Sequence, residues 1–206
     1  MIAASRPARM PVCARSAASQ GRHRRPSGTS GDRLATVTIV VVGEHPEFAA
    51  LVERRRALGV DGHDEVWEGV YHVAPYAHAR HGRIQQRLAR VLDPYADAAG
   101  YEVVGSFNLG QPDDYRVPDL AVRGFDSDDV YVPTAALVVE VLSTGDESYA
   151  KFDFYARRNV GEILIADPDS CAVRLFRLTG ANYREVEVSG LLKVTADELT
   201  TAMNWA

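Results

Sequence analysis

One short stretch of the chain, residues 135–144, constrains the fold more than any other. It reads AALVVEVLST, in which seven of the first eight residues are apolar and three of those are valines. Such a run is typical of a central strand that is covered on both faces of a sheet. Glu140 stands in its middle, although a glutamate is almost never fully buried without a partner. The stretch therefore predicts a buried strand that carries an acid with a specific task.

The rest of the chain alternates between helical and extended patterns. Helices are predicted from Pro46 to about Leu58, from Arg80 to about Ala98 and from about Ser148 to Arg158. Strands are predicted over residues 36–42, 65–75 (as a hairpin that turns near Glu68 and Gly69), 101–109, 114–122, 135–143, 162–167, 172–178 and 183–188. This order predicts an α/β or α+β domain built on one mixed sheet. No glycine-rich phosphate loop follows any strand, which argues against a doubly wound nucleotide binder.

The first 36 residues differ in composition from the remainder. They carry seven arginines and one acid, a charge of +6, whereas the rest of the chain carries −11. Because the segment is rich in Ser, Gly, Ala and Pro and lacks apolar periodicity, we expect a disordered tail over 1–36 and a single domain over 37–206. The tail lacks the apolar core of a secretory signal, and no apolar run approaches the roughly 20 residues of a membrane helix. We therefore expect a cytoplasmic protein without a membrane segment.

A second acid interrupts the strand predicted before Glu140. Asp119 lies in RVPDLAV, and consecutive strands commonly pair, so the Asp119 and Glu140 carboxylates can lie side by side. Adjacent carboxylates repel one another unless a cation lies between them. Mg²⁺ prefers oxygen ligands, commonly binds one or two carboxylates and keeps waters that can act as nucleophiles. The pair therefore predicts a Mg²⁺ (or Mn²⁺) site, with a structural acid at Glu140 and a turn cap at Asp119 as the simpler alternatives.

Lys151 supplies a positive charge from the helix that follows. It lies eleven residues beyond Glu140, and helical side chains tilt toward the helix N-terminus, so its ammonium group can reach back over the strand end. There it would orient the attacking water or stabilise a phosphoryl transition state. The alternative is an ordinary solvated lysine on the helix surface. Tyr155, on the same helix, is expected to pack in the core.

An ordered set of segments resembles the Uma-two family of proposed restriction endonucleases, which belongs to the PD-(D/E)xK nuclease superfamily. The segments are VWEGVYHVAP, the helix opening at His81, RVPDL, PTAALVVEVLST, Lys151 with Tyr155, and VGEILIADPD. The resemblance implies a restriction-endonuclease-like fold, in which a mixed central sheet is flanked by helices. It also implies a Mg²⁺-dependent endonuclease that acts on DNA.

The resemblance extends to single residues. Asp119 and Glu140 match the two metal ligands, and Lys151 matches the catalytic lysine, which this family carries on the helix after the strand. Glu65 and His81 match a further acid and a recurrent histidine, which makes them candidate accessory residues.

Three functions of different classes follow. The first is a metal-dependent DNA endonuclease, the second a binding protein that keeps the nuclease fold without turnover, and the third a hydrolase of a small phosphate ester. The acidic domain argues against DNA, since DNA-binding proteins usually present a basic face. A local arginine strip would answer this objection, and a homodimer would place two such strips along one duplex. The candidate strips are Arg80, Arg83, Arg87 and Arg90 on one helix, or Arg157 and Arg158 on another.

Overall fold

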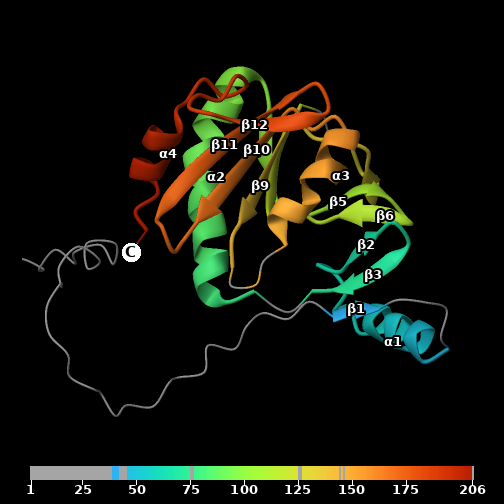
Figure 1. Cartoon of the computed structure of the whole chain (residues 1–206). Helices are drawn as coiled ribbons and strands as arrows, with labels where there is room; N and C mark the ends of the chain where they lie inside the picture. Colours follow the sequence, from blue (N-terminus) through green and yellow to red (C-terminus); the bar gives the residue numbers. More distant parts are fainter. Residues whose placement is uncertain are drawn as a thin grey trace, which may run out of the picture.

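The fold consists of two mixed sheets with helices packed around them (Figure 1). The computed structural model describes residues 39–41, 46–74, 77–124, 127–143, 145 and 147–205. The predicted disordered tail over 1–36 lies outside these residues. The α/β class and the restriction-endonuclease-like arrangement are confirmed, but the described strands form two sheets, whereas we predicted one.

The central sheet has the order β12-β11-β10-β9-β7-β4. Its strands are β12 (Asn182–Val186), β11 (Ala172–Thr179), β10 (Glu162–Asp167), β9 (Leu137–Val141), β7 (Leu120–Arg123) and β4 (Glu102–Val104). β9 and β10 are parallel, and the other neighbours are antiparallel. Every residue of β9 is buried, as predicted for the strand that carries Glu140.

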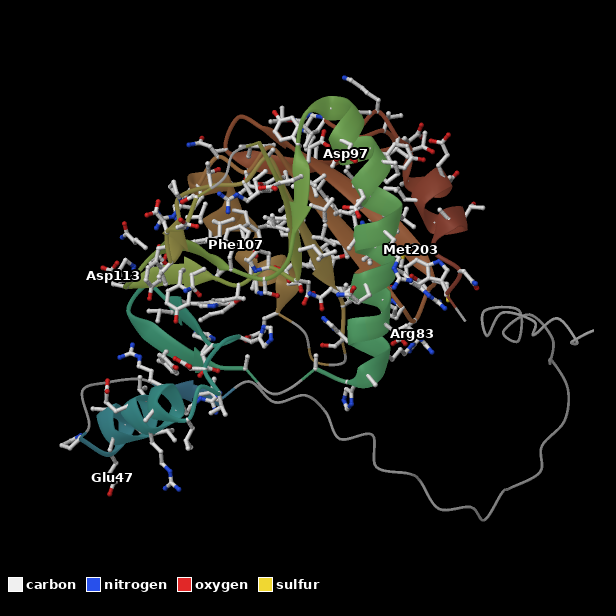
Figure 2. The ribbon with its side chains drawn as sticks, turned by 180° about the vertical axis from the view of Figure 1, so that it is seen from behind. Glu47, Arg83, Asp97, Phe107, Asp113 and Met203 are labelled. Atoms are coloured by element: carbon white, nitrogen blue, oxygen red, sulfur yellow. The ribbon has the colours of Figure 1, made fainter. Side chains whose placement is uncertain are left out.

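One face of the central sheet is covered by α2 (Ala79–Ala99) and the short α4 (Ala196–Ala202). α2 is amphipathic and buries four side chains at helical spacing, Ile84, Leu88, Leu92 and Ala96. Burying a Leu or Ile fully contributes about 1.5–3 kcal/mol, so this face is a major source of stability. Seen from behind, α2 crosses the sheet, with Met203 at the end of α4 beside it (Figure 2). No helix among the described residues is long and apolar enough to cross a membrane.

The opposite face of the central sheet is covered by the helix that follows β9. The 3₁₀ turn η2 (Ser148–Lys151) leads directly into α3 (Phe152–Arg157), whose Phe154 and Tyr155 are buried against this face. Side chains alternate along a strand, and Val138 of β9 packs in the same cluster. Glu140 therefore points toward α3 and not toward α2.

The outer sheet has the order β1-β3-β2-β6-β5-β8. Its strands are β1 (Ile39–Val41), β3 (Val70–Val73), β2 (Glu65–Trp67), β6 (Asp114–Arg116), β5 (Asn108–Gln111) and β8 (Tyr131–Val132). The predicted hairpin is confirmed as β2 and β3, with left-handed Glu68 and Gly69 (φ 51° and 84°) at its turn. Helix α1 (Pro46–Ala57) packs on this sheet through Val52 and through Arg55, which binds the buried Asp64 with two hydrogen bonds.

Two segments predicted as single strands are each divided between the two sheets. Residues 101–109 form β4 and the start of β5, while residues 114–122 form β6 and most of β7. Pro118 lies between β6 and β7, and a proline cannot donate to a sheet ladder. Asp119 therefore follows directly on the point where the chain passes from the outer to the central sheet.

Helix α4 was not predicted, although its N-terminus has a recognisable signal. Thr195 accepts a hydrogen bond from the backbone N–H of Glu198, whose carboxylate accepts one from the backbone N–H of Thr195. This reciprocal arrangement is a capping box, which the sequence pattern Thr-x-x-Glu encodes.

Replacing this cap gives a first testable prediction. Thr195→Ala should lower the free energy of unfolding by about 1 kcal/mol, because a backbone donor in the first turn of α4 loses its acceptor. Urea unfolding measures the change. Thr195→Ser keeps the hydroxyl and serves as the control, and equal losses in both variants would show that the cap does not stabilise the helix.

Candidate active site

The pairing of β7 with β9 brings the two predicted metal ligands together. Leu120 lies opposite Val139, and the backbone N–H of Asp119 donates to the Val139 carbonyl at 3.1 Å. Asp119 thus directly precedes β7 and lies beside the part of β9 that carries Glu140. The Asp119 carboxylate also accepts from the backbone N–H of Val141 at 2.8 Å. The two acids therefore lie on adjacent strands, as their sequence pattern predicted.

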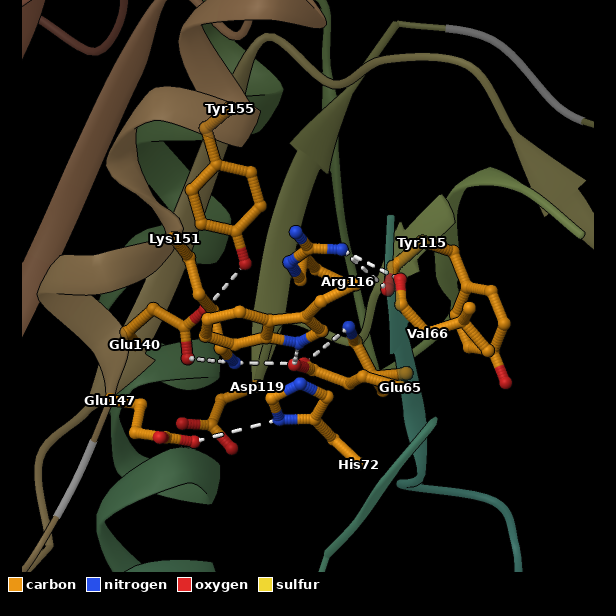
Figure 3. A network of polar contacts seen from close by, with 12 residues as sticks. Glu65, Val66, His72, Tyr115, Arg116, Asp119, Glu140, Glu147, Lys151 and Tyr155 are labelled. Atoms are coloured by element: carbon orange, nitrogen blue, oxygen red, sulfur yellow. Dashed lines mark hydrogen bonds and ion pairs between the residues drawn. The ribbon is translucent and has the colours of Figure 1, made fainter. Parts of the chain in front are cut away.

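Glu140 is buried, with 3% of its surface exposed, and has two side-chain partners from the following helix. The Tyr155 hydroxyl donates to Oε1 at 2.5 Å, and the Lys151 Nζ lies 3.3 Å from the same oxygen (Figure 3). Burial raises the pKa of Glu140 to about 8; Lys151 opposes this rise, while Asp119 and Glu65 add to it. Tyr155 packs in the core, as predicted, but its hydroxyl also binds the central carboxylate.

Lys151 ends the 3₁₀ turn η2, and only 12% of its side chain is exposed. Its Nζ lies 2.8 Å from Glu65 Oε1, in addition to its contact with Glu140. Burial lowers the pKa of Lys151, but the Glu140 and Glu65 carboxylates outweigh burial and raise the pKa above that of a free lysine. The side chain is thus a charged ammonium group between two acids, which excludes the alternative of an ordinary solvated lysine.

Glu65 enters the site from β2 of the outer sheet. Its Oε1 accepts from the backbone N–H of Val117 at 2.8 Å, and its Oε2 accepts from the indole N–H of Trp67 at 2.6 Å. Since Lys151 binds the same carboxylate, the structure places this candidate accessory acid in direct contact with the candidate lysine.

His81 reaches the site from the first turn of α2. Its Nε2 lies 2.8 Å from Asp119 Oδ1, and Gln85, one turn further, donates to the Asp119 backbone carbonyl at 2.6 Å. Residues four apart share one helix face, so both side chains reach the same aspartate. The second candidate accessory residue is therefore also at the site.

Trp67, His72 and Glu147 also line the site, although they were not singled out as site residues from the sequence. His72 lies opposite Glu65 in the β2–β3 register and stacks on Trp67, with ring centroids 4.4 Å apart. Its Nδ1 lies 3.8 Å from Glu147 Oε2, and burial lowers the pKa of the imidazole, which keeps it neutral at pH 7. Once the hairpin is recognised, the pairing of its two strands is the signal that identifies His72.

These side chains line a pocket of about 200 Å³ between the outer sheet, the start of α2 and the η2 turn. Among the residues that the structure describes, the ionisable lining comprises four histidines, one lysine (Lys151) and four acids, namely Glu65, Asp119, Glu140 and Glu147. The acids outnumber the ammonium group of Lys151, so the pocket carries surplus negative charge when its carboxylates are ionised. Such a site attracts cations and repels an unaccompanied phosphate.

The donor set of the pocket suits a hard divalent cation. Among the described residues, no group of three or more His, Cys, Asp and Glu side chains is arranged to hold a metal ion. Mg²⁺ does not require such a group, because it commonly takes one or two carboxylates and keeps several waters. Asp119 and Glu140 provide two neighbouring carboxylates, in a pocket that is rich in acids. These two residues therefore fit the cation that the sequence pattern predicted.

Comparisons with known proteins agree with this architecture. One solved structure, "a putative nuclease belonging to DUF820 from Anabaena variabilis", is similar with a TM-score of 0.56 and 15% identity, over 68% of this chain and 90% of that chain. At this identity the likeness shows the shared fold alone. No curated protein matches the chain. Residues 51–206 match the Uma2 family, described as "putative restriction endonuclease", and since this match spans well over half of the chain, the protein belongs to that family.

Proposed function

We propose that this protein is a Mg²⁺- or Mn²⁺-dependent DNA endonuclease of the PD-(D/E)xK type. The observation that carries the proposal is that Asp119 is hydrogen-bonded to the backbone on both sides of Glu140, whose carboxylate lies 3.3 Å from the ammonium group of Lys151. Two acids can hold a cation that activates water, and a lysine beside them can stabilise charge on the phosphoryl group. Membership of the Uma2 family supports the same class of reaction.

Each residue has a separate task in the proposed reaction. Asp119 and Glu140 would hold the cation, which activates water and neutralises charge on a phosphate oxygen. Lys151 would stabilise the negative charge of the phosphoryl transition state or orient the attacking water. His81 and Tyr155 each bind one of the two acids, which limits the orientations that the carboxylates can take. A homodimer would bring two such pockets to one duplex.

Asp119→Asn tests the proposal. The wild type should bind Mn²⁺ by calorimetry and nick supercoiled plasmid only with Mg²⁺ or Mn²⁺, whereas the variant should lose at least about 100-fold in nicking rate. The reason is that a neutral amide is a poor ligand for a hard cation. Asp93→Asn, on an exposed part of α2, is the matched control. A wild type that binds no divalent cation and leaves DNA intact would refute the proposal.

A second candidate function is the hydrolysis of a small phosphate ester. Three of the six arginines considered for a DNA-binding strip are bound to acids at separate places: Arg80 to Asp169 at 3.3 Å, Arg157 to Glu68 at 3.0 Å, and Arg158 to an acid in β6. A scattered arrangement favours a small substrate over a duplex. Hydrolysis of bis(p-nitrophenyl) phosphate by samples that leave plasmid intact would favour this second candidate.

A further inference from the structure

Three hydrogen-bond donors converge on the carboxylate of Glu65. They are the ammonium group of Lys151 (2.8 Å), the backbone N–H of Val117 (2.8 Å) and the indole N–H of Trp67 (2.6 Å). A carboxylate accepts at both oxygens, whereas an amide accepts at only one. The ionised side chain thus matches all three donors, and Gln cannot.

Trp67 is itself held in place by a stack of planar groups. The ring of His72 lies on one side of the indole, with centroids 4.4 Å apart, and the guanidinium carbon of the buried Arg116 lies 4.4 Å from the indole centroid. The same guanidinium lies 4.1 Å from the centroid of Phe154, which belongs to α3. Cations over aromatic faces attract, and desolvation strengthens the attraction. The stack therefore joins the outer-sheet hairpin to the helix that begins beside Lys151.

We infer that Glu65 and Trp67 form a positioning pair for Lys151. Glu65 binds the ammonium group, and Trp67 fixes the carboxylate so that Lys151 is held at the Glu140 strand end. The inference rests on the proposed function, since it assigns Lys151 a reaction to serve. It also gives the acids of the pocket separate tasks: Asp119 and Glu140 bind the cation, whereas Glu65 holds the ammonium group of Lys151.

Kinetics distinguish a positioning pair from metal ligands. With saturating Mn²⁺, Glu65→Gln and Trp67→Phe should lower the kcat of plasmid nicking by about 10- to 100-fold, the range found for residues that orient a reactive group. The KM for DNA and the calorimetric Kd for Mn²⁺ should stay unchanged. Trp67→Phe keeps an aromatic ring in the stack but removes the N–H that reaches Glu65, together with part of the indole; the Trp205 control below accounts for the lost ring area.

Trp205 offers a matched control for the loss of an indole hydrogen bond. It is the only other tryptophan of the sequence, is buried in the core near α4, and donates its N–H to the Thr200 carbonyl at 3.0 Å. Trp205→Phe should leave kcat unchanged. If both Trp→Phe variants lose the same amount of kcat, the loss reflects a general effect on stability and not the positioning of Lys151. That result would overturn the inference.

Nuclear magnetic resonance tests the contacts without any activity. The sequence contains two lysines, Lys151 and Lys193, so lysine labelled with ¹³C at Cε gives two signals. Glu65→Gln and Trp67→Phe should each shift the Lys151 signal and leave the Lys193 signal in place. Glu65→Gln should also shift one of two indole N–H signals, the one that disappears in Trp67→Phe.

The outcomes separate this inference from the proposed function. A weaker Mn²⁺ affinity in Glu65→Gln, comparable to that of Asp119→Asn, would make Glu65 a metal ligand and overturn the positioning pair. An unmoved Lys151 signal would also overturn it, whether or not the wild type cuts DNA. If the signals shift as expected but the wild type cleaves nothing, the proposed function fails and the Glu65 contact with Lys151 stands as structural.

Discussion

Replacing Glu140 by Gln should abolish cation binding and plasmid nicking together. The substitution keeps the size of a fully enclosed side chain that accepts from Tyr155 and Lys151, but it removes the negative charge. Because Mg²⁺ binds carboxylate oxygen far better than amide oxygen, the nicking rate should fall by on the order of 100-fold or more. Calorimetry with Mn²⁺ and the nicking assay measure the two effects on the same samples.

A matched control keeps this experiment specific. Glu185 lies on β12, is exposed and pairs with Arg174, so Glu185→Gln makes the same chemical change away from the pocket. It should bind Mn²⁺ and nick plasmid as the wild type does. If Glu140→Gln retains both properties, Glu140 is a structural acid, and the chain keeps a nuclease fold without this use of its central glutamate.

Glu140 also predicts a pH dependence for the stability of the metal-free protein. Burial raises the pKa of Glu140 in the folded state to about 8, although Lys151 opposes the rise. An unfolded glutamate titrates near about 4.3, so the stabilising contribution of the protonated group is lost as the pH rises through about 8. In EDTA, the free energy of unfolding of the wild type should therefore fall relative to Glu140→Gln between about pH 5 and 8. Parallel urea-unfolding curves for both proteins across this range would contradict the assignment.

Lys151→Met should have the second large effect. It should lower the turnover rate, whereas the protein should still bind the cation. Among the described residues that line the pocket, Lys151 is the only lysine or arginine, and the substitution removes its ammonium group. Removing one preorganised donor to a transition state commonly costs about 10²- to 10³-fold in kcat. The affinity for Mn²⁺ should hold or increase, because the ammonium group no longer repels the cation. Lys193→Met, at an exposed position beyond β12, is the control.

The same variant should be less stable without metal. Glu65 and Glu140 both lose their cationic partner in Lys151→Met, and leaving a buried charge unpaired costs about 3–5 kcal/mol. Added Mg²⁺ should recover part of this loss by binding only the folded state. A variant whose stability and kcat both equal those of the wild type would show that Lys151 serves neither the fold nor the reaction.

Local patterns predicted the elements with a strong period. The apolar run around Glu140 became the fully buried β9, and the 3.6-residue spacing after Arg80 became α2. The division of residues 101–109 and 114–122 between two sheets was not foreseen. An extended, alternating segment looks the same whether its two halves pair with one set of neighbours or two, so its sheet assignment depends on partners elsewhere in the chain.

For the candidate site, too, the sequence determined some relations between residues, and the tertiary structure decided the others. The sequence alone determined that an acid lies in a buried strand, that Asp119 lies in an extended segment before it, and that Lys151 lies near the start of the following helix, because these relations depend on local period and short connections. Only the tertiary structure decided that Glu65 and Trp67, from the outer sheet, meet Lys151. Their meeting depends on how two sheets pack around one pocket, and no periodicity in the chain encodes that packing.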